Sequence, residues 1–187
     1  LSVQLWETFR NEGTHALWTP YIFFGMPSYA SLIFTPFAYL PYIPLFFINM
    51  IITLPPAFAH VIHYPFAGLG VYLLLKDRGT EFWPAVFGGL AFMFTTHLIS
   101  MEVFGQGSKL MTSIYLPLAL WSMQRLFKQG GFLYLGLTAL ILGLQLQRGH
   151  VQIVYYTWLV LGTYFLYQLI VQAKRGDTSR IGGQSLR

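Results

Sequence analysis

Apolar residues dominate the chain in long runs, and short polar clusters separate these runs. A helix needs about 20 consecutive apolar residues to cross a membrane. Five stretches approach that length, so we predict five membrane-spanning helices. Two of the stretches, the third and the fourth, are short and would need thin or tilted surroundings. The predicted spans are 56–75, 82–101, 110–127, 132–147 and 151–172.

The first 55 residues follow a different pattern. Residues 1–12 place Leu5, Trp6 and Phe9 near helical spacing between charged residues, which predicts a short amphipathic helix at the membrane surface. Residues 18–54 are aromatic and apolar, but Pro and Gly interrupt them, and such backbone cannot face lipid. We therefore predict an interfacial or re-entrant segment. The alternative, an additional span within 28–54, would move the preceding residues to the other side of the membrane.

Composition supports an all-α integral membrane protein. The chain is 55% hydrophobic and 9% charged, with a mean hydropathy of +0.55, whereas about 25% of the residues in a soluble domain are charged. It has no cysteine, which excludes disulfides and thiolate metal sites. We expect an extracytoplasmic part (1–55), a helix bundle (56–172) and a cytoplasmic tail or linker (173–187), and we expect the chain to be incomplete at both ends.

The cations are distributed asymmetrically over the predicted loops. The net charge is +5, and cytoplasmic loops of membrane proteins are enriched in Lys and Arg. This distribution predicts that the C-terminal end is cytoplasmic, and it explains the positive charge without nucleic acid. Three cations fall on the outer side, Arg10, Lys109 and Arg148, and eight on the inner side: Lys76, Arg78, Arg125, Lys128, Lys174, Arg175, Arg180 and Arg187.

Two polar clusters, residues 102–109 and 148–152, flank the predicted hairpin of the third and fourth spans, so both should return to one face. Lys109 and Arg148 suit an anion such as a phosphate. Glu102 or His150 could act as a general base, and Glu102 is also the best candidate ligand for a divalent cation. The alternative is that these are ordinary loop residues.

Three histidines lie within predicted spans: His60, His63 and His97. An intramembrane histidine is a candidate functional residue, and one option is axial ligation of a tetrapyrrole such as haem or chlorophyll. The other option is a hydrogen bond between helices. No acidic residue lies at ligand spacing from His60 and His63, so no metal site is predicted there.

Small and cyclic residues predict the packing of the helices. Gly88, Gly89, Gly136 and Gly143 should permit close approach of neighbouring helices. Pro117, inside the third span, predicts a kink.

Four short motifs then occur in a recognisable order: Trp-Thr-Pro at 18–20, Phe-Gly-Met-Pro at 24–27, Gly-Gln-Gly-Ser-Lys at 105–109 and Gly-His-Val-Gln-Ile-Val-Tyr-Tyr at 149–156. In order and spacing, the chain from about residue 4 to about residue 172 resembles the YfhO family of bacterial membrane proteins. The resemblance implies a GT-C-type glycosyltransferase of the bacterial cytoplasmic membrane. Such enzymes transfer a sugar from a polyprenyl-phosphate carrier to a cell-surface acceptor on the outer face.

The chain departs from the family pattern at two places. The family's catalytic Asp is expected a few residues before Gln4, and the first Asp here is Asp77, on the cytoplasmic side. Gln106 stands where the family often has His. The resemblance suggests Glu102 for catalysis and five residues for the lipid-linked sugar: Gln106, Lys109, Arg148, His150 and Gln152.

Two further hypotheses compete with the transferase. One is a non-catalytic subunit of a larger membrane complex that holds a tetrapyrrole through His60, His63 or His97. The other is a transporter of lipid-linked oligosaccharides, which shares the cations but needs no base. The partners expected are the lipid bilayer, the polyprenyl-phosphate-linked sugar and other membrane subunits.

Overall fold

The computed structural model describes residue 11 and residues 18–19, 26–27, 39–53, 55 and 58–174. The predicted amphipathic helix at 1–12, apart from residue 11, and most of the segment before residue 39 lie outside these ranges. Two short strands, β1 (Trp18–Thr19) and β2 (Met26–Pro27), pair in antiparallel fashion, with Trp18 opposite Pro27.

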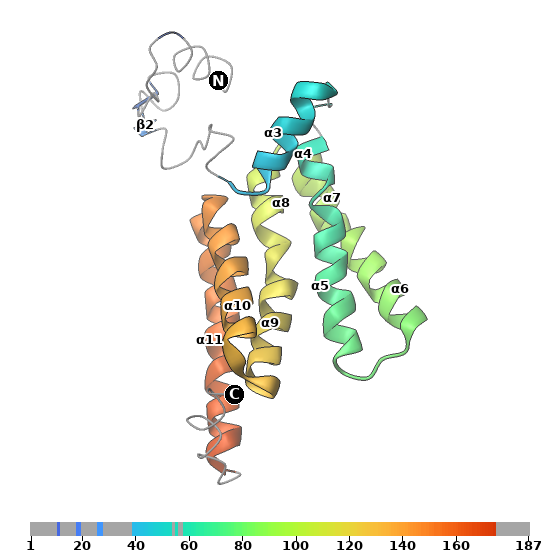
Figure 1. The fold of residues 1–187 in the computed structure, drawn as a ribbon, viewed down its shortest axis with the longest axis vertical. Helices are drawn as coiled ribbons and strands as arrows, with labels where there is room; N and C mark the ends of the chain where they lie inside the picture. The colour runs from blue at the N-terminus through green and yellow to red at the C-terminus, as the bar shows by residue number, and fades with distance from the viewer. Residues whose placement is uncertain are drawn as a thin grey trace.

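All other regular structure in the described residues is helical, as the apolar runs predict (Figure 1). The helices are α3 (Tyr42–Ile51), α4 (Phe58–Val61), α5 (Tyr64–Lys76), α6 (Phe82–Met93), α7 (Thr96–Val103), α8 (Gly107–Ser113), α9 (Tyr115–Gln129), α10 (Gly131–Gln147) and α11 (Val151–Lys174).

Three helical segments are long and apolar enough to cross a membrane: Phe58–Lys76, Phe82–Val103 and Val151–Ala173. They correspond to the first, second and fifth predicted spans. The fourth is α10, a shorter apolar helix, and the third is divided between α8 and α9. A protein with membrane-spanning helices is therefore supported, while the count of five stays a prediction.

The break between α8 and α9 has a local cause. It lies at Ile114, and Pro117 follows within one turn. A proline has no N–H to donate to the carbonyl four residues earlier, here Ser113, and its ring crowds that carbonyl. The helix is therefore interrupted one turn before Pro117, the residue from which a kink was predicted.

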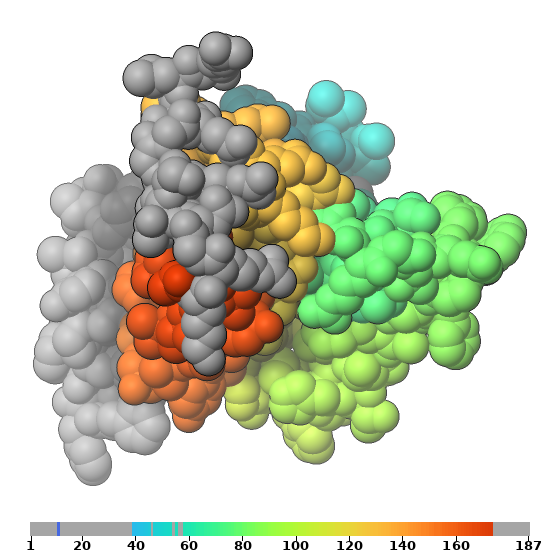
Figure 2. Space-filling view, turned by 90° about the horizontal axis from the view of Figure 1, so that it is seen from below, coloured from blue at the N-terminus to red at the C-terminus, as the bar shows by residue number. Residues whose placement is uncertain are grey.

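Helix α9 is central, with α5 packed on one side and α10 on the other (Figure 1). From below, α5 and α6 (green) form one side of the molecule and α11 (red-orange) another (Figure 2). The buried core follows the same line, and the segment that runs from α8 into α9 supplies five of its side chains: Leu110, Ile114, Tyr115, Leu118 and Ala119.

Glycines set the distance between α5 and its neighbours. A Cβ atom added to Gly89 would lie 2.7 Å from the Gly68 carbonyl oxygen, and one added to Gly70 would lie 2.8 Å from the Leu118 nitrogen. Close approach was predicted correctly for Gly89 and also for its neighbour Gly88, which abuts Leu75. It was wrong for Gly136 and Gly143, since neither has a described neighbour within 4 Å.

The helices place the polar clusters at two opposite ends (Figure 1). The α5–α6 and α9–α10 turns lie at the lower end. There the Arg125 guanidinium pairs with the buried Asp77 carboxylate, and Lys128 Nζ donates to the Asp77 carbonyl at 3.0 Å. Residues 39–42, 60–63, 102–109 and 148–152 lie at the upper end, which we call the polar end. The two clusters expected to share one face therefore do so.

Candidate functional site at the polar end

Arg148 is the buried cation of the polar end. It follows the last turn of α10, where its backbone N–H donates to the Gln145 carbonyl, and Gly149 turns the chain with a φ of +69°. This turn directs the side chain inward, and Arg148 is 9% exposed. Its guanidinium carbon lies 4.5 Å from the centre of the Tyr39 ring and 5.2 Å from that of Tyr42.

The charge of Arg148 is not matched by a carboxylate in the described part of the chain. The two ion pairs found there are His60–Glu102 and Arg125–Asp77. The Arg148 side chain is hydrogen-bonded to Tyr42, but its Nε atom is buried and finds no acceptor among the described residues. Burying an unpaired charge costs several kcal/mol, and a desolvated cation–π contact contributes about 2 kcal/mol. The aromatic rings therefore offset only part of the cost, and the site favours an anionic ligand.

Tyr39 holds this arrangement in place through a chain of hydrogen bonds. His63 Nδ1–H donates to the Ala59 carbonyl at 2.6 Å, so the neutral ring presents Nε2 as an acceptor. Tyr39 OH donates to that Nε2 at 2.7 Å, and its oxygen accepts a hydrogen bond from Tyr115 OH. Burial, together with Tyr115, raises the pKa of Tyr39, so the phenol is neutral and cannot compensate Arg148.

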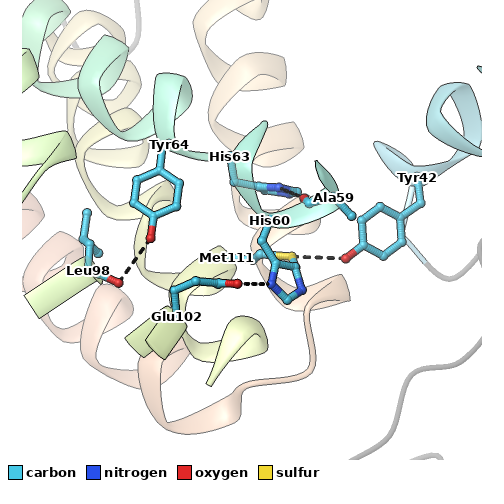
Figure 3. Close-up of polar contacts among 8 residues, drawn as sticks. All are labelled: Tyr42, Ala59, His60, His63, Tyr64, Leu98, Glu102 and Met111. Carbon is cyan, nitrogen blue, oxygen red and sulfur yellow. Dashed lines mark hydrogen bonds and ion pairs between the residues drawn. The ribbon is translucent and has the colours of Figure 1, made fainter. Parts of the chain in front are cut away.

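A second polar pair lies beside this network (Figure 3). His60 Nδ1 and Glu102 Oε1 are 2.8 Å apart, and each side chain is about one-third exposed (33% and 32%). The other carboxylate oxygen, Oε2, is buried without a hydrogen-bond partner in the described structure. The His60 ring lies against Gly107, the first residue of α8, where a Cβ atom would come within 2.9 Å of His60 Nε2.

The remaining predicted site residues lie at the same end but make fewer contacts. Lys109 is half-buried, and its carbonyl accepts a hydrogen bond from Ser113. Gln106 is exposed at the start of α8. His150 is half-buried, with Nδ1 buried and lacking a described partner. Gln152 is exposed and donates to Tyr156 OH at 3.1 Å.

The contacts of the histidines bear on the tetrapyrrole hypothesis. Both ring nitrogens of His63 are engaged, so a metal could bind only by displacing Tyr39 or the Ala59 carbonyl. One nitrogen of His60 is bonded to Glu102, and His97 is exposed on α7. In the part of the chain that the structure describes, no three His, Asp or Glu side chains gather as a metal site would require.

Sequence reasoning missed the aromatic part of this site. Tyr39 and Tyr42 carry no motif, and Tyr39 pairs with residues 24 and 76 positions away. The pairing of His60 with Glu102, 42 positions apart, was equally invisible. One available signal was Gly107 in the Gly-Gln-Gly-Ser-Lys motif, because a glycine opening a helix often marks a close contact.

Comparison of the chain with protein-family models, with curated proteins and with solved structures yields no match.

Proposed function

We propose that the chain is a YfhO-like polytopic membrane protein that binds a polyprenyl-phosphate-linked sugar at the polar end and transfers the sugar to a cell-surface acceptor. The observation that carries this proposal is Arg148, a nine-tenths buried cation with no carboxylate paired to it in the described ranges.

The chemistry of the donor suits this site. A phosphate group would give Arg148 the negatively charged partner that the described carboxylates do not provide. An arginine also offers a planar set of N–H donors to a phosphate. Lys109, at the same end, adds a second and more accessible cation. The polyprenyl tail needs an apolar path, and large apolar side chains are exposed along α5, α6 and α11.

The proposed orientation follows from the charges. Lys76, Arg78, Arg125 and Lys128 lie at the lower end, opposite Lys109 and Arg148. Because Lys and Arg are enriched in cytoplasmic loops, the polar end faces the outer side of a bacterial cytoplasmic membrane.

Donor binding tests this proposal directly. The chain, purified in lipid nanodiscs, is titrated with undecaprenyl phosphate-linked glucose, and bound lipid is measured by native mass spectrometry. We expect Arg148→Ala to weaken binding about 10- to 100-fold, since a hydrogen bond to a charged group contributes about 1.5–3 kcal/mol. Arg78→Ala, which removes an exposed cation at the other end, is the matched control.

Equal binding by the wild-type chain and by Arg148→Ala would contradict the proposal. Binding without any transfer of sugar would point instead to an accessory or transport role at the same site.

A further inference from the structure

We infer that His60 and Glu102 form a catalytic dyad in which His60 accepts the proton of the acceptor hydroxyl and Glu102 positions and stabilises the imidazole. This inference rests on the proposed function, because it supplies the base for the same transfer. It assigns a role to His60 that the sequence did not suggest.

The hydrogen bond between the two residues sets the protonation of the ring. Glu102 Oε1 lies 2.8 Å from His60 Nδ1, and a carboxylate can only accept, so the neutral ring carries its proton on Nδ1. Nε2 then presents a lone pair, which is the state a general base requires. A carboxylate on the far nitrogen also stabilises the imidazolium that forms after proton transfer.

The second carboxylate oxygen supports this role. Glu102 Oε2 is buried, and none of the described residues donates a hydrogen bond to it. Within the described residues, His60 is therefore the partner to which this carboxylate is bonded. A carboxylate that orients a histidine through its far nitrogen is the arrangement that a catalytic dyad requires.

The Gly-Gln-Gly-Ser-Lys loop is shaped around the imidazole. The edge of the ring that carries Nδ1, Cε1 and Nε2 lies against Gly107, where a Cβ atom would come within 2.9 Å of Nε2 and 3.0 Å of Nδ1. This contact restricts the position of the ring and places Nε2 beside the loop that also carries Lys109. Since a third of the His60 side chain stays exposed, an acceptor can reach it.

The proposed reaction balances as a single displacement. The acceptor oxygen bonds to the anomeric carbon of the sugar, and its proton moves to His60 Nε2. The bond between the anomeric carbon and the phosphate oxygen breaks, and its electron pair leaves with polyprenyl phosphate. The departing phosphate gains negative charge, which Arg148 and Lys109 are placed to stabilise.

The test separates donor binding from turnover. His60→Gln and Glu102→Gln are assayed for transfer of glucose from undecaprenyl phosphate-linked glucose and, separately, for donor binding. We expect transfer to fall about 100- to 10,000-fold for His60→Gln, the usual contribution of a general base, and at least 10-fold for Glu102→Gln. Donor binding should change less than twofold. His97→Gln, an exposed histidine on α7, is the matched control.

The pH profile distinguishes catalysis from a structural role. Wild-type turnover should decline on acidification, because protonated His60 cannot accept a proton, and this decline should be absent from the residual activity of His60→Gln. Among the described residues, the titratable groups drawn around His60 are Glu102 from α7, His63 from the following turn, Tyr64 of α5 and Tyr42 of α3; α8 presents Gly107, which has no side chain (Figure 3).

Displacing the ring offers a third measurement. Gly107→Ala should lower turnover while both dyad residues remain, whereas Gly136→Ala, with no described neighbour within 4 Å, should not. Full transfer by His60→Gln, or a wild-type chain that binds donor but transfers nothing, would overturn the dyad and leave donor binding intact. Failure of the wild-type chain to bind donor would overturn the proposed function itself.

Discussion

At the scale of single residues, Arg148 is expected to have opposite effects on ligand binding and on the free energy of unfolding. A buried cation lowers the free energy of unfolding when its desolvation is not compensated, and no described carboxylate pairs with Arg148. Under the proposed function, a bound phosphate supplies that compensation. The cation–π contacts with Tyr39 and Tyr42 hold the guanidinium in place without neutralising it.

Arg148→Met should therefore stabilise the protein in the absence of ligand. We expect a gain of up to about 1–4 kcal/mol, seen as a higher midpoint of thermal unfolding in detergent, together with loss of donor binding. A lower midpoint would contradict this expectation and would show that the contacts of Arg148 with Tyr39 and Tyr42 outweigh the cost of burying its charge.

The two parts of the Tyr39 side chain should have separate effects. Its hydroxyl should contribute to the free energy of unfolding, and its ring should hold the Arg148 guanidinium in position. Tyr39→Phe removes the hydrogen bonds with His63 and Tyr115 but keeps the ring. We expect a loss of about 1–3 kcal/mol, the cost of leaving a buried polar group unsatisfied, with donor binding nearly unchanged. Tyr42→Phe removes a bond to the Met111 sulfur and a hydrogen bond with Arg148, so we expect it to weaken donor binding more than Tyr39→Phe does.

The sequence identified the cations of the polar end but not the tyrosines around them. Lys109 and Arg148 stand out because charge is rare in this chain, at 9% of residues. Tyr39 is one of 12 tyrosines in an aromatic-rich sequence, and no local pattern shows which of them is buried. Its burial depends on residues distant in the chain, which a pattern of neighbours does not encode.

At the scale of elements, contacts between backbones hold α5 to α6. Gly68 and Gly89 face each other so closely that neither position accommodates a methyl group without movement of the backbone. Where apolar lipid surrounds helices, such close packing replaces the hydrophobic effect as the force that joins them.

Gly89→Ala should therefore destabilise the α5–α6 pair. We expect a cost of about 1–3 kcal/mol, as for other overpacked sites, measured by the unfolding midpoint. Gly143→Ala changes the same residue type inside a helix but meets no described atom within 4 Å. An equal effect of both substitutions would mean that helix propensity, rather than contact, decides the outcome.

Helix breaks show how far local chemistry could predict these elements. The interruption between α4 and α5 lies at residues 62–63, just before Pro65. It could have been predicted, because proline is favoured in the first turn of a helix and therefore marks a helix start. The interruption between α6 and α7 falls at Phe94 and Thr95, where neither Gly nor Pro occurs. Thr95, a residue type that favours the N-cap position, precedes α7 with extended backbone but makes no capping hydrogen bond there, so the local signal for this break is weak.

At the scale of the whole molecule, the two ends differ in charge and in chemistry. The Asp77–Arg125 pair lies at the lower end, together with exposed Lys and Arg residues. The polar end gathers the buried cation and the His60–Glu102 pair. This division makes the sidedness of the protein in the membrane a measurable property.

Single cysteines can report that sidedness, since the natural chain has none. Ser108→Cys, at the polar end, and Gln129→Cys, at the lower end, are both exposed. In intact spheroplasts, a membrane-impermeant maleimide should label Ser108→Cys and leave Gln129→Cys unlabelled until the membrane is opened. The reverse pattern would invert the proposed orientation.

The position of Arg148 late in the chain also has a consequence in time. During synthesis, Tyr39, His63 and Tyr115 are all made by the end of α9, as are His60 and Glu102. Arg148 follows only after the whole of α10. A nascent chain paused between α9 and α10 therefore already contains His60 and Glu102 but lacks Arg148. Under the proposed function, the residue that holds the anionic lipid is synthesised after the pair that accepts the proton.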